Sequence, residues 1–394
     1  MRDIFRKLMV WLGLTTTRLV CLANRIKYVK AIKEETKQNP QPKLSELQKK
    51  EIKKYFDQYG FKNVSTRWHR FYGGFNKYFS TRYIPQDLFF SHIELALNNQ
   101  EYGTLQDKNL LRRMFEDVPQ PITIMGKIGA LYSKDGKIVS KKKCLLECLN
   151  HDNFIIKPTT ATYGGHGIIK YDICKDDRLG DYQKLSKILD SYNEDFIVQK
   201  LVAQSDSMKK LNTTSLNTIR ISSYLRSEEV VILFSIVRFG AKGVFLDNIS
   251  QGGFYCQISD DGSLHKHAYN TDKKTISKTE EGTILEDFPI PNYEGVKELV
   301  KSVHQRVPYF KMISWDLALD TNDMPVLIEF NAFGQSIDFQ AITGPLFGEY
   351  TDEVLDITKR FKENTTRVNI IKVLKKKTHN NVEIEKIDRE LANV

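Results

Sequence analysis

The sequence predicts an α+β protein with largely antiparallel sheets and a helical N-terminal region. From residue 154 onward, short apolar runs bounded by glycine, asparagine and aspartate follow one another, a pattern that indicates β-strands. Most gaps between these runs are too short to hold a helical crossover, so neighbouring strands are expected to pair in antiparallel fashion. The longer gaps and the first hundred residues have patterns typical of helices.

The individual elements are predicted in chain order from local patterns. A helix is expected over 44–59, where Ser45 can cap the first turn and a glutamate follows it. Later helices are expected over 181–193, over 295–307 and from residue 351 into the tail. Strands are expected over 154–157, 167–171, 196–200, 218–225, 230–239, 252–259, 313–319 and 326–330.

The composition is that of a folded globular chain. The 394 residues include 41% hydrophobic and 27% charged side chains. The longest run without a charge has twelve residues, well short of the roughly 20 that a membrane-spanning helix needs, so an integral membrane protein is excluded. Five scattered cysteines without a C-x-x-C pair predict reduced thiols rather than disulfides or a zinc site, which favours a cytoplasmic location.

The net charge of +10 is concentrated at the two ends of the chain. Residues 1–50 hold twelve basic and four acidic side chains, and residues 356–394 hold ten and six. The part between them is nearly neutral. We therefore expect three regions: a basic helical N-terminal region over 1–80, a nearly neutral catalytic or binding region over 81–358, and a basic C-terminal helix or tail over 359–394.

Two interpretations of the basic N-terminal region remain open. Its charges are either the solvated faces of helices, or they contact an anionic membrane at the inner face. The second is favoured by apolar residues near one side of a basic helix, namely Ile4, Phe5, Leu8, Met9 and Leu12. No nucleic-acid-binding module is recognisable, so nucleic acid is not an expected partner. The apolar segment 8–14 is too short for a convincing signal peptide.

A predicted hairpin near the end of the chain, SWDLALDTNDMPVLIEFNAFG, gathers oxygen donors. Centring its turn between Asn322 and Asp323 places Asp316 opposite Glu329. Asn331 shares the face of Glu329, because residues two apart on a strand point to the same side. Opposed carboxylates are destabilising unless a cation neutralises them, so the pattern predicts one or two Mg²⁺ ions. The alternative is an ordinary hairpin whose acidic face points at water.

A second motif, FIIKPTTATYGGHGI, has a strand ending in Lys157 and then a loop with Gly164, Gly165 and Gly167. Small residues let backbone N–H groups approach an anionic ligand closely, so the loop could cradle phosphates. The lysine precedes the glycines, so this is not a Walker A loop. A glycine-rich hairpin tip without a ligand is the alternative.

The order of these motifs resembles the ATP-grasp superfamily: a strand lysine, a glycine loop, an apolar strand ending in a hinge, and carboxylates on a late hairpin. Four stretches resemble its sugar-transfer-associated branch, and the resemblance covers roughly residues 80–358. The stretches are LQDKNLLRRMFEDVPQPITI, SLNTIRISSYL, LDNISQGGFYCQI, and ISWDLAL with IEFNAFGQSIDFQ.

The resemblance implies an ATP-grasp fold, in which two α+β subdomains clasp ATP, and a role for individual residues. Lys108 and Lys157 match the two phosphate-binding lysines, and Gly164, Gly165 and Gly167 match the flexible loop. Gln199, Lys200 and Val202 match the adenine-binding hinge, with Asp206 as the candidate for the ribose. Asp316, Glu329 and Asn331 match the Mg²⁺ ligands. Five residues are expected near the acceptor substrate: Asn217, Asp247, Asn248, Gly252 and Gly253.

Arg220 is a further catalytic candidate, because it shares a strand face with Thr218 and Ser222 and alternates with isoleucines. In a closed site its guanidinium could stabilise charge on a transferring phosphoryl group. The alternative is an arginine on a solvent-facing strand.

The resemblance implies an enzyme that uses ATP and Mg²⁺ for carboxylate–amine ligation through an acyl-phosphate. Its expected substrates are a carboxylate and an amine linked to sugars, such as a uronic acid or an amino sugar in surface (capsular) polysaccharide biosynthesis. One alternative is an ATP-grasp phosphotransferase acting on a small molecule or sugar. Another is a non-catalytic protein that binds a membrane surface.

Overall fold

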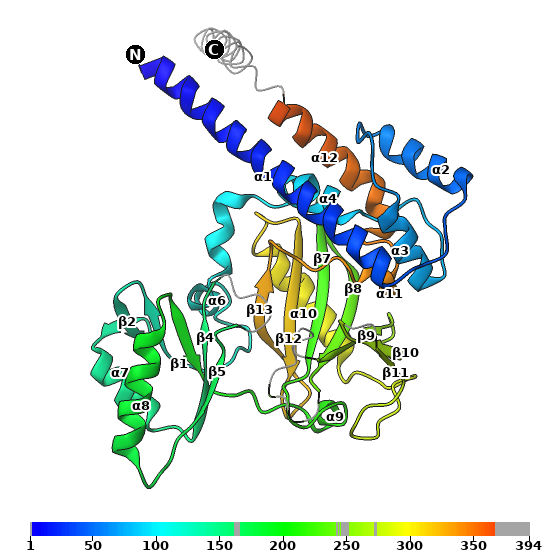
Figure 1. Ribbon diagram of the computed structural model, residues 1–394. Helices are drawn as coiled ribbons and strands as arrows, with labels where there is room; N and C mark the ends of the chain where they lie inside the picture. Colours follow the sequence, from blue (N-terminus) through cyan, green and yellow to red (C-terminus); the bar gives the residue numbers. More distant parts are fainter. Residues whose placement is uncertain are drawn as a thin grey trace, which may run out of the picture. The chain divides into compact units, whose positions relative to one another are not determined.

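The predicted helices and strands are present, together with further elements that were not predicted, and the chain divides into two units. The computed structural model in Figure 1 describes residues 2–160, 166–241, 243, 245, 252–271 and 274–366. Unit 1 comprises Met1–Asn98 and Ser336–Val394, and unit 2 comprises Asn99–Gln335. The three-part division with boundaries at residues 80 and 358 stays a prediction.

The secondary-structure elements in the described part of unit 1 are all helices. The helix predicted over 44–59 begins at a capping box, since the Ser45 hydroxyl accepts a hydrogen bond from Gln48 N (3.1 Å) and Gln48 Oε1 accepts one from Ser45 N (2.9 Å). The elements of this unit are α1 (Arg2–Gln38), α2 (Glu46–Asp57), α3 (Arg67–Asn76), α4 (Gln86–Leu88), the π-helix η1 (Phe89–Ile93), α5 (Glu94–Leu97), α11 (Gln340–Thr343), the 3₁₀-helix η4 (Gly348–Tyr350) and α12 (Thr351–Thr366).

Two distant segments of the sequence share the core of unit 1. The Gln340 side chain accepts a hydrogen bond from Ile84 N (2.9 Å) and donates one to Ile84 O (3.0 Å). The hydroxyls of Tyr55 and Tyr59 both donate to Asp352 Oδ1 at 2.7 Å. The buried cluster of this unit likewise combines both segments, with Ile32, Trp68, Phe71, Tyr72 and Tyr83 packed with Ala341.

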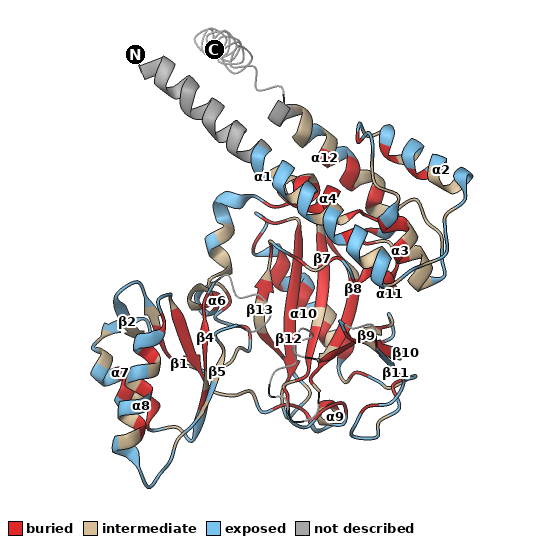
Figure 2. Cartoon of the chain, viewed as in Figure 1, coloured by how far each residue is buried: buried red, intermediate tan, exposed pale blue. Residues whose placement is uncertain are grey.

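Unit 2 begins with a six-stranded antiparallel sheet, in the order β3-β2-β1-β6-β4-β5. Two helices, α7 (Lys141–Cys148) and α8 (Arg178–Ser191), cover one face of this sheet (Figure 1), and Cys144, Cys148, Leu185 and Leu189 are buried against it. Figure 2 shows the buried central strands of this sheet and the exposed outer faces of these helices. Preceding the sheet are η2 (Gln100–Gln106) and α6 (Lys108–Met114); its strands are β1 (Thr123–Ile128), β2 (Leu131–Lys134), β3 (Lys137–Val139), β4 (Asn153–Pro158), β5 (Ile169–Asp172) and β6 (Phe196–Gln199).

A seven-stranded antiparallel sheet completes unit 2, in the order β11-β10-β9-β8-β7-β12-β13. The helix α10 (Tyr293–Gln305) packs against it and contributes Val296, Val300 and Val303 to the core. The antiparallel pairing expected from the short gaps is confirmed. The remaining elements are α9 (Asp206–Lys209), β7 (Thr218–Arg226), β8 (Glu229–Phe239), β9 (Phe254–Ile258), β10 (Leu264–Tyr269), β11 (Thr275–Ile276), β12 (Met312–Leu319) and β13 (Pro325–Asn331).

A buried polar chain lies under the last hairpin. Trp315 Nε1 donates to Ser223 Oγ (2.8 Å), Ser223 lies 2.7 Å from His304 Nδ1, and His304 Nε2 lies 2.9 Å from the carbonyl oxygen of Phe310. That oxygen can only accept, so Nε2 carries the proton and the Ser223 hydroxyl donates to Nδ1. Burial lowers the pKa of His304 to about 4, so the ring is neutral and its hydrogen bonds are all satisfied.

The hairpin β12–β13 pairs Asp316 with Glu329, as predicted, but its turn differs from the prediction. Asp323 N donates to Asp320 O (2.9 Å), and Asp320 N donates to Met324 O (3.0 Å). Asp323 has φ 59°, so the loop is a type I turn followed by a left-handed residue. The prediction of a turn centred between Asn322 and Asp323 is wrong, since Leu319 pairs with Pro325. A register shift after Asp316 adds one residue to β13 and restores the predicted carboxylate pair.

Candidate functional site

A cavity of about 370 Å³ in unit 2 brings together seven of the residues singled out in the sequence. This volume lies within the range of about 300–1,000 Å³ typical of small-ligand sites. Elements of both sheets line it, including the hairpin β12–β13 and the segment after β6. The sequence-predicted residues in its lining are Lys108, Lys157, Gln199, Lys200, Val202, Asp316 and Glu329.

The fold holds Lys108 and Lys157 of the cavity near each other. Lys108 begins α6, whose first turn is capped by the Asp107 carboxylate accepting a hydrogen bond from Asn109 N at 2.7 Å. Lys108 N also donates to Thr159 O (3.2 Å), and the Thr159 hydroxyl donates to Asp107 (3.1 Å). Thr159 directly follows β4, the strand that carries Lys157. These bonds fix the start of α6 against the end of β4.

Lys157 is a buried cation that forms no ion pair within the described part of the chain, although the charges of Glu329 and Asp316 act on it. Its side chain is 7% exposed, and its ammonium makes no hydrogen bond or ion pair with any described residue. Burial, followed by repulsion from Lys108, lowers the pKa of Lys157 to about 8. An unpaired ammonium is costly to bury, so this position is suited to an anionic ligand.

Glu329 forms an ion pair with Lys108. Its carboxylate lies 2.8 Å from Lys108 Nζ. Burial opposes ionisation of Glu329, but the charges of Lys108 and Lys157 outweigh it and hold the pKa of this carboxyl below its usual range. Glu329 is therefore ionised at neutral pH and available as an oxygen ligand.

Asp316 is held by two arginines. Arg220, its direct neighbour on β7, donates to both carboxylate oxygens, at 2.7 and 2.6 Å. Arg238 on β8 lies 3.3 Å from the same carboxylate and also donates to the Thr218 hydroxyl. Asp316 is 1% exposed. Arg220 thus points at a predicted metal ligand, and the alternative of a solvent-facing arginine does not describe it.

Arg238 lines the cavity and was not predicted from the sequence. It stands near the end of the long apolar strand β8, where a charged side chain is a signal that could have been used. Gln106 was also missed: its Oε1 accepts hydrogen bonds from Ala332 N (2.6 Å) and Phe333 N (3.3 Å), which positions the chain just after Asn331.

The carboxylate oxygens of Asp316 and Glu329 are suitable ligands for Mg²⁺. The arginine contacts use about three of the roughly four acceptor positions of the Asp316 carboxylate, so one remains for a cation. Asn331 lies two residues beyond Glu329, and its buried Nδ2 has no hydrogen-bond partner among the described residues. Within the same residues no group of three His, Cys, Asp or Glu side chains could hold a metal. Two carboxylates are enough for Mg²⁺, which usually takes its other ligands from water and phosphate.

The other end of the cavity is suited to a flat, hydrogen-bonding ring. Gln199 is buried at the end of β6, and its Oε1 has no partner in the described structure. Residues 201–203 follow it outside any helix or strand and line the cavity with apolar side chains. The carbonyl of Gln199 is therefore free to accept a hydrogen bond from an amino group.

The remaining predicted residues lie outside the lining of this cavity, and their roles stay predictions. Asp206 is exposed and pairs with Lys209 at 2.7 Å. Asn217 is fully buried, and its Nδ2 donates within the protein, to Met208 O (2.7 Å) among others. Gly167 has φ +74° and stands where a Cβ would lie 2.9 Å from Pro158. Gly252 and Gly253 precede β9, whereas four predicted positions lie outside the described residues: Gly164, Gly165, Asp247 and Asn248.

Comparison with known families identifies the class of the protein. The family model described as sugar-transfer associated ATP-grasp matches residues 91–352. The chain therefore belongs to this family, and the predicted ATP-grasp fold is confirmed. ATP and Mg²⁺, the cofactors expected from the sequence, are those of an ATP-grasp protein. The cavity contains carboxylate oxygens that suit Mg²⁺, and cationic and hydrogen-bonding side chains that suit ATP. No curated protein matches the chain.

The solved structures to which this chain is similar include two ligases and a synthetase. An L-amino acid ligase from Bacillus licheniformis is 13% identical, with 65% of this chain and 48% of that chain covered and a TM-score of 0.36. The ligase PsnB, complexed with a minimal precursor, Mg and ADP, is 11% identical, with coverages of 67% and 62% and a TM-score of 0.37. D-alanyl-alanine synthetase A from Vibrio cholerae is 12% identical, with coverages of 65% and 64% and a TM-score of 0.38. The chain spans about half of the first and less than two thirds of the other two.

Proposed function

We propose that this protein is an ATP-dependent carboxylate–amine ligase that forms a C–N bond through an acyl-phosphate. The observation that carries the proposal is the buried, unpaired Lys157 ammonium beside the Lys108–Glu329 and Asp316–Arg220 pairs. The cations match a triphosphate, and the carboxylates match the metal that accompanies it. The family description favours a sugar-linked substrate, so we propose a uronic acid or amino-sugar derivative in surface polysaccharide synthesis.

The proposed roles of the side chains follow from their positions. ATP supplies the phosphoryl group when bound with Mg²⁺, and Asp316, Glu329 and Asn331 would hold the metal. Lys108 and Lys157 would neutralise the phosphates, while Arg220 and Arg238 orient Asp316 and add positive charge nearby. Gln199 Oε1 would accept a hydrogen bond from the adenine amino group. In-line phosphoryl transfer needs positioning and charge neutralisation, so no protein nucleophile is required.

The proposed reaction balances in two steps. A carboxylate oxygen of the acceptor attacks the γ-phosphorus, the bond to the ADP oxygen breaks, and an acyl-phosphate forms. The amine nitrogen then attacks the acyl carbon and loses a proton, and phosphate leaves with one former carboxylate oxygen. The products are an amide, ADP and phosphate.

An isotope experiment tests this chemistry. The protein is incubated with ATP, Mg²⁺, amines and uronic acids labelled with ¹⁸O in the carboxylate, and the products are analysed by mass spectrometry. Ligation predicts an amide that keeps one label and phosphate that carries the other. A stable phosphorylated product without amide would instead establish the phosphotransferase. Absence of any nucleotide turnover with the acids and amines tested would favour the non-catalytic alternative.

The low pKa of Lys157 predicts that nucleotide binding weakens in alkaline solution. Below pH about 8 the ammonium is charged and ready for a phosphate, whereas above it the free protein has lost that proton and must regain it on binding. The affinity for ADP with Mg²⁺ should be flat below pH about 8 and fall by up to about tenfold per pH unit above it. Calorimetric titration over this range measures the effect.

Lys157→Arg is the matched variant for this titration. Arginine stays charged throughout this pH range, so the affinity of the variant for ADP with Mg²⁺ should stay constant where the affinity of the unmodified protein falls. An equal alkaline loss in both proteins would assign the effect to another group.

We also propose that α1 contacts an anionic membrane surface. Leu19, Leu22 and Ile26 lie on one stripe of the helix and are 61%, 54% and 61% exposed, with the exposed side chains of Arg25 and Lys33 nearby along the helix. Within the described residues, none of the helices has the length and apolar character needed to cross a membrane. A contact of this kind would be peripheral.

Changing this stripe should release the protein from vesicles. Replacing Leu19, Leu22 and Ile26 together by Gln should weaken co-sedimentation with phosphatidylglycerol vesicles at least about tenfold, because three apolar side chains no longer enter the bilayer surface. Leu47→Gln, a change at a leucine 67% exposed on α2, is the control and should have little effect. Undiminished sedimentation of the triple variant would refute the contact.

A further inference from the structure

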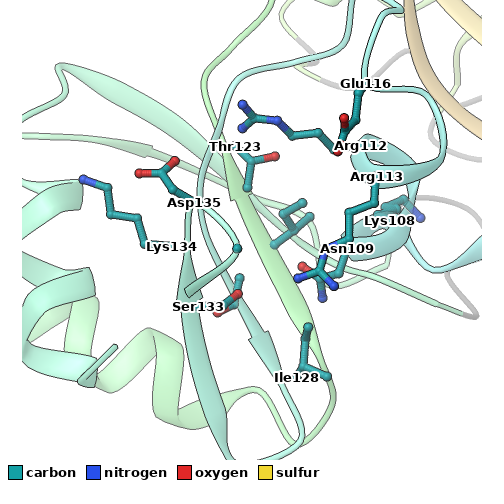
Figure 3. Close-up of a pocket in the computed structure, with 13 residues that line it drawn as sticks. Lys108, Asn109, Arg112, Arg113, Glu116, Thr123, Ile128, Ser133, Lys134 and Asp135 are labelled. Carbon is teal, nitrogen blue, oxygen red and sulfur yellow. Dashed lines mark hydrogen bonds between the residues drawn. The ribbon is translucent and has the colours of Figure 1, made fainter. Parts of the chain in front are cut away.

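Figure 3 shows the lining of a second cavity, of about 450 Å³. It lies next to the cavity described above, on the same face of the six-stranded sheet. Gly126 and Ile197 in its lining are cross-strand neighbours, and Ile197 is in turn the neighbour of Lys157, so all three point to one side of the sheet. Lys108 lines both cavities. The two spaces are therefore adjacent and separated by a proposed phosphate-binding lysine.

Two arginines on α6 supply positive charge to this second cavity. Arg112 and Arg113 are exposed, and within the described part of the chain neither guanidinium has a hydrogen-bond or ion-pair partner. Figure 3 shows the Arg112 guanidinium extending into the cavity towards Thr123, and that of Arg113 beside Asn109. Two unpaired guanidinium groups on adjacent residues are typical of sites that bind phosphate or carboxylate.

The lining holds four other charged side chains, two lysines and two carboxylates. Lys134 is neutralised by Glu147 at 2.6 Å, and Lys108 by Glu329. Two carboxylates also line the space, those of Glu116 and Asp135, and both belong to exposed residues. With both lysines neutralised, Arg112 and Arg113 stand against these two carboxylates.

The helix that carries the arginines is held firmly against the sheet. Asn109 Nδ2 donates to Lys127 O (3.3 Å), and a Cβ on Gly126 would lie 2.4 Å from Asn109 Oδ1. A side chain at residue 126 would have to displace the Asn109 amide. The positions of Arg112 and Arg113 relative to the strand are thereby fixed before any ligand arrives, which lowers the entropy lost on binding.

We infer that the second cavity binds an anionic group, phosphate or carboxylate, of the acceptor substrate. This inference rests on the proposed function, because an acceptor must lie next to the phosphoryl group that it receives. Lys108 connects the two spaces, so an acceptor anchored by Arg112 and Arg113 can reach the transferring group. The hydroxyls of Thr123 and Ser133 in the same lining add neutral hydrogen-bond partners.

The test uses the full chain and two probes that represent the two sources of negative charge. Glucose 1-phosphate and glucuronate are titrated by calorimetry into the protein saturated with Mg²⁺ and a non-hydrolysable ATP analogue, so that the nucleotide cavity is filled. We expect one of them to bind, and the double variant R112A/R113A to bind it at least about tenfold more weakly, equivalent to about 1.4 kcal/mol. The probe that binds identifies the class of the anionic group.

Lys142→Ala, which removes an exposed charge from α7, is the control and should bind the probe like the unmodified protein. Failure of both probes to bind, or equal weakening in the control, would overturn the inference. The analogue is titrated separately, since failure of nucleotide binding would refute the proposed function instead. Repeating the probe titrations without nucleotide keeps the role of the two arginines testable in that case.

Discussion

Replacing Glu329 by Gln is expected to reduce nucleotide turnover by about a thousandfold or more, equivalent to roughly 4 kcal/mol of transition-state stabilisation. The amide keeps the size and one oxygen of the side chain but loses the charge that Mg²⁺ prefers. It also leaves Lys108 without its partner at 2.8 Å, next to the unpaired Lys157. Release of ADP in the presence of Mg²⁺ and the labelled acceptors is the measurement.

The same substitution at Glu229 is the matched control. Glu229 begins β8 on the same sheet and is exposed, so Glu229→Gln should leave turnover unchanged. Thermal unfolding of both variants separates a lost metal ligand from a lost fold. A Glu329→Gln protein that turns over nucleotide at the original rate would remove this residue from the proposed metal site.

Trp315→Ala should destabilise unit 2 by about 3–5 kcal/mol, the range typical of a large aromatic side chain truncated in a core. Trp315 is fully buried and packs against Phe115 and Phe330. The change also removes the donor to Ser223, within the chain that ends at His304. Because the free energy of unfolding of a domain is about 5–15 kcal/mol, the substitution would remove a large part of it.

Urea unfolding followed by far-ultraviolet circular dichroism measures this loss without depending on tryptophan fluorescence. Met324→Ala, at an apolar residue that is 50% exposed in the turn of the same hairpin, should shift the midpoint little. A Trp315→Ala midpoint equal to that of the control would show that the core under the hairpin tolerates the cavity.

Much of the fold could be predicted because its strands are short apolar runs separated by turn residues. The strands β1 to β3 were not predicted, although an Asp135-Gly136 turn joins β2 to β3 and is a strong hairpin signal. Gly126 interrupts the apolar pattern of β1, and the reason for this glycine is the close approach of Asn109 from another element. Such contacts cannot be read from a local pattern.

The site could be predicted in part for a similar reason. Asp316 and Glu329 face each other across one hairpin, so their spacing in the sequence was enough to pair them. The predicted pair is correct although the predicted position of the turn is wrong, because an extra residue in β13 compensates for the difference. Arg238 reaches Asp316 from β8, a strand on the far side of β7, and this requires knowledge of the strand order.

The make-up of unit 1 from two separate stretches has a consequence for how the protein is produced on the ribosome. Gln340 and Asp352 complete contacts to Ile84 and Tyr55, but they emerge only after the whole of unit 2 has been synthesised. Unit 2 can therefore reach its native state first, while the earliest helices wait with apolar surface exposed. Chaperone demand during translation should accordingly be set by the N-terminal helices, and a nascent chain stalled before residue 336 should hold an incomplete first unit beside a finished second one.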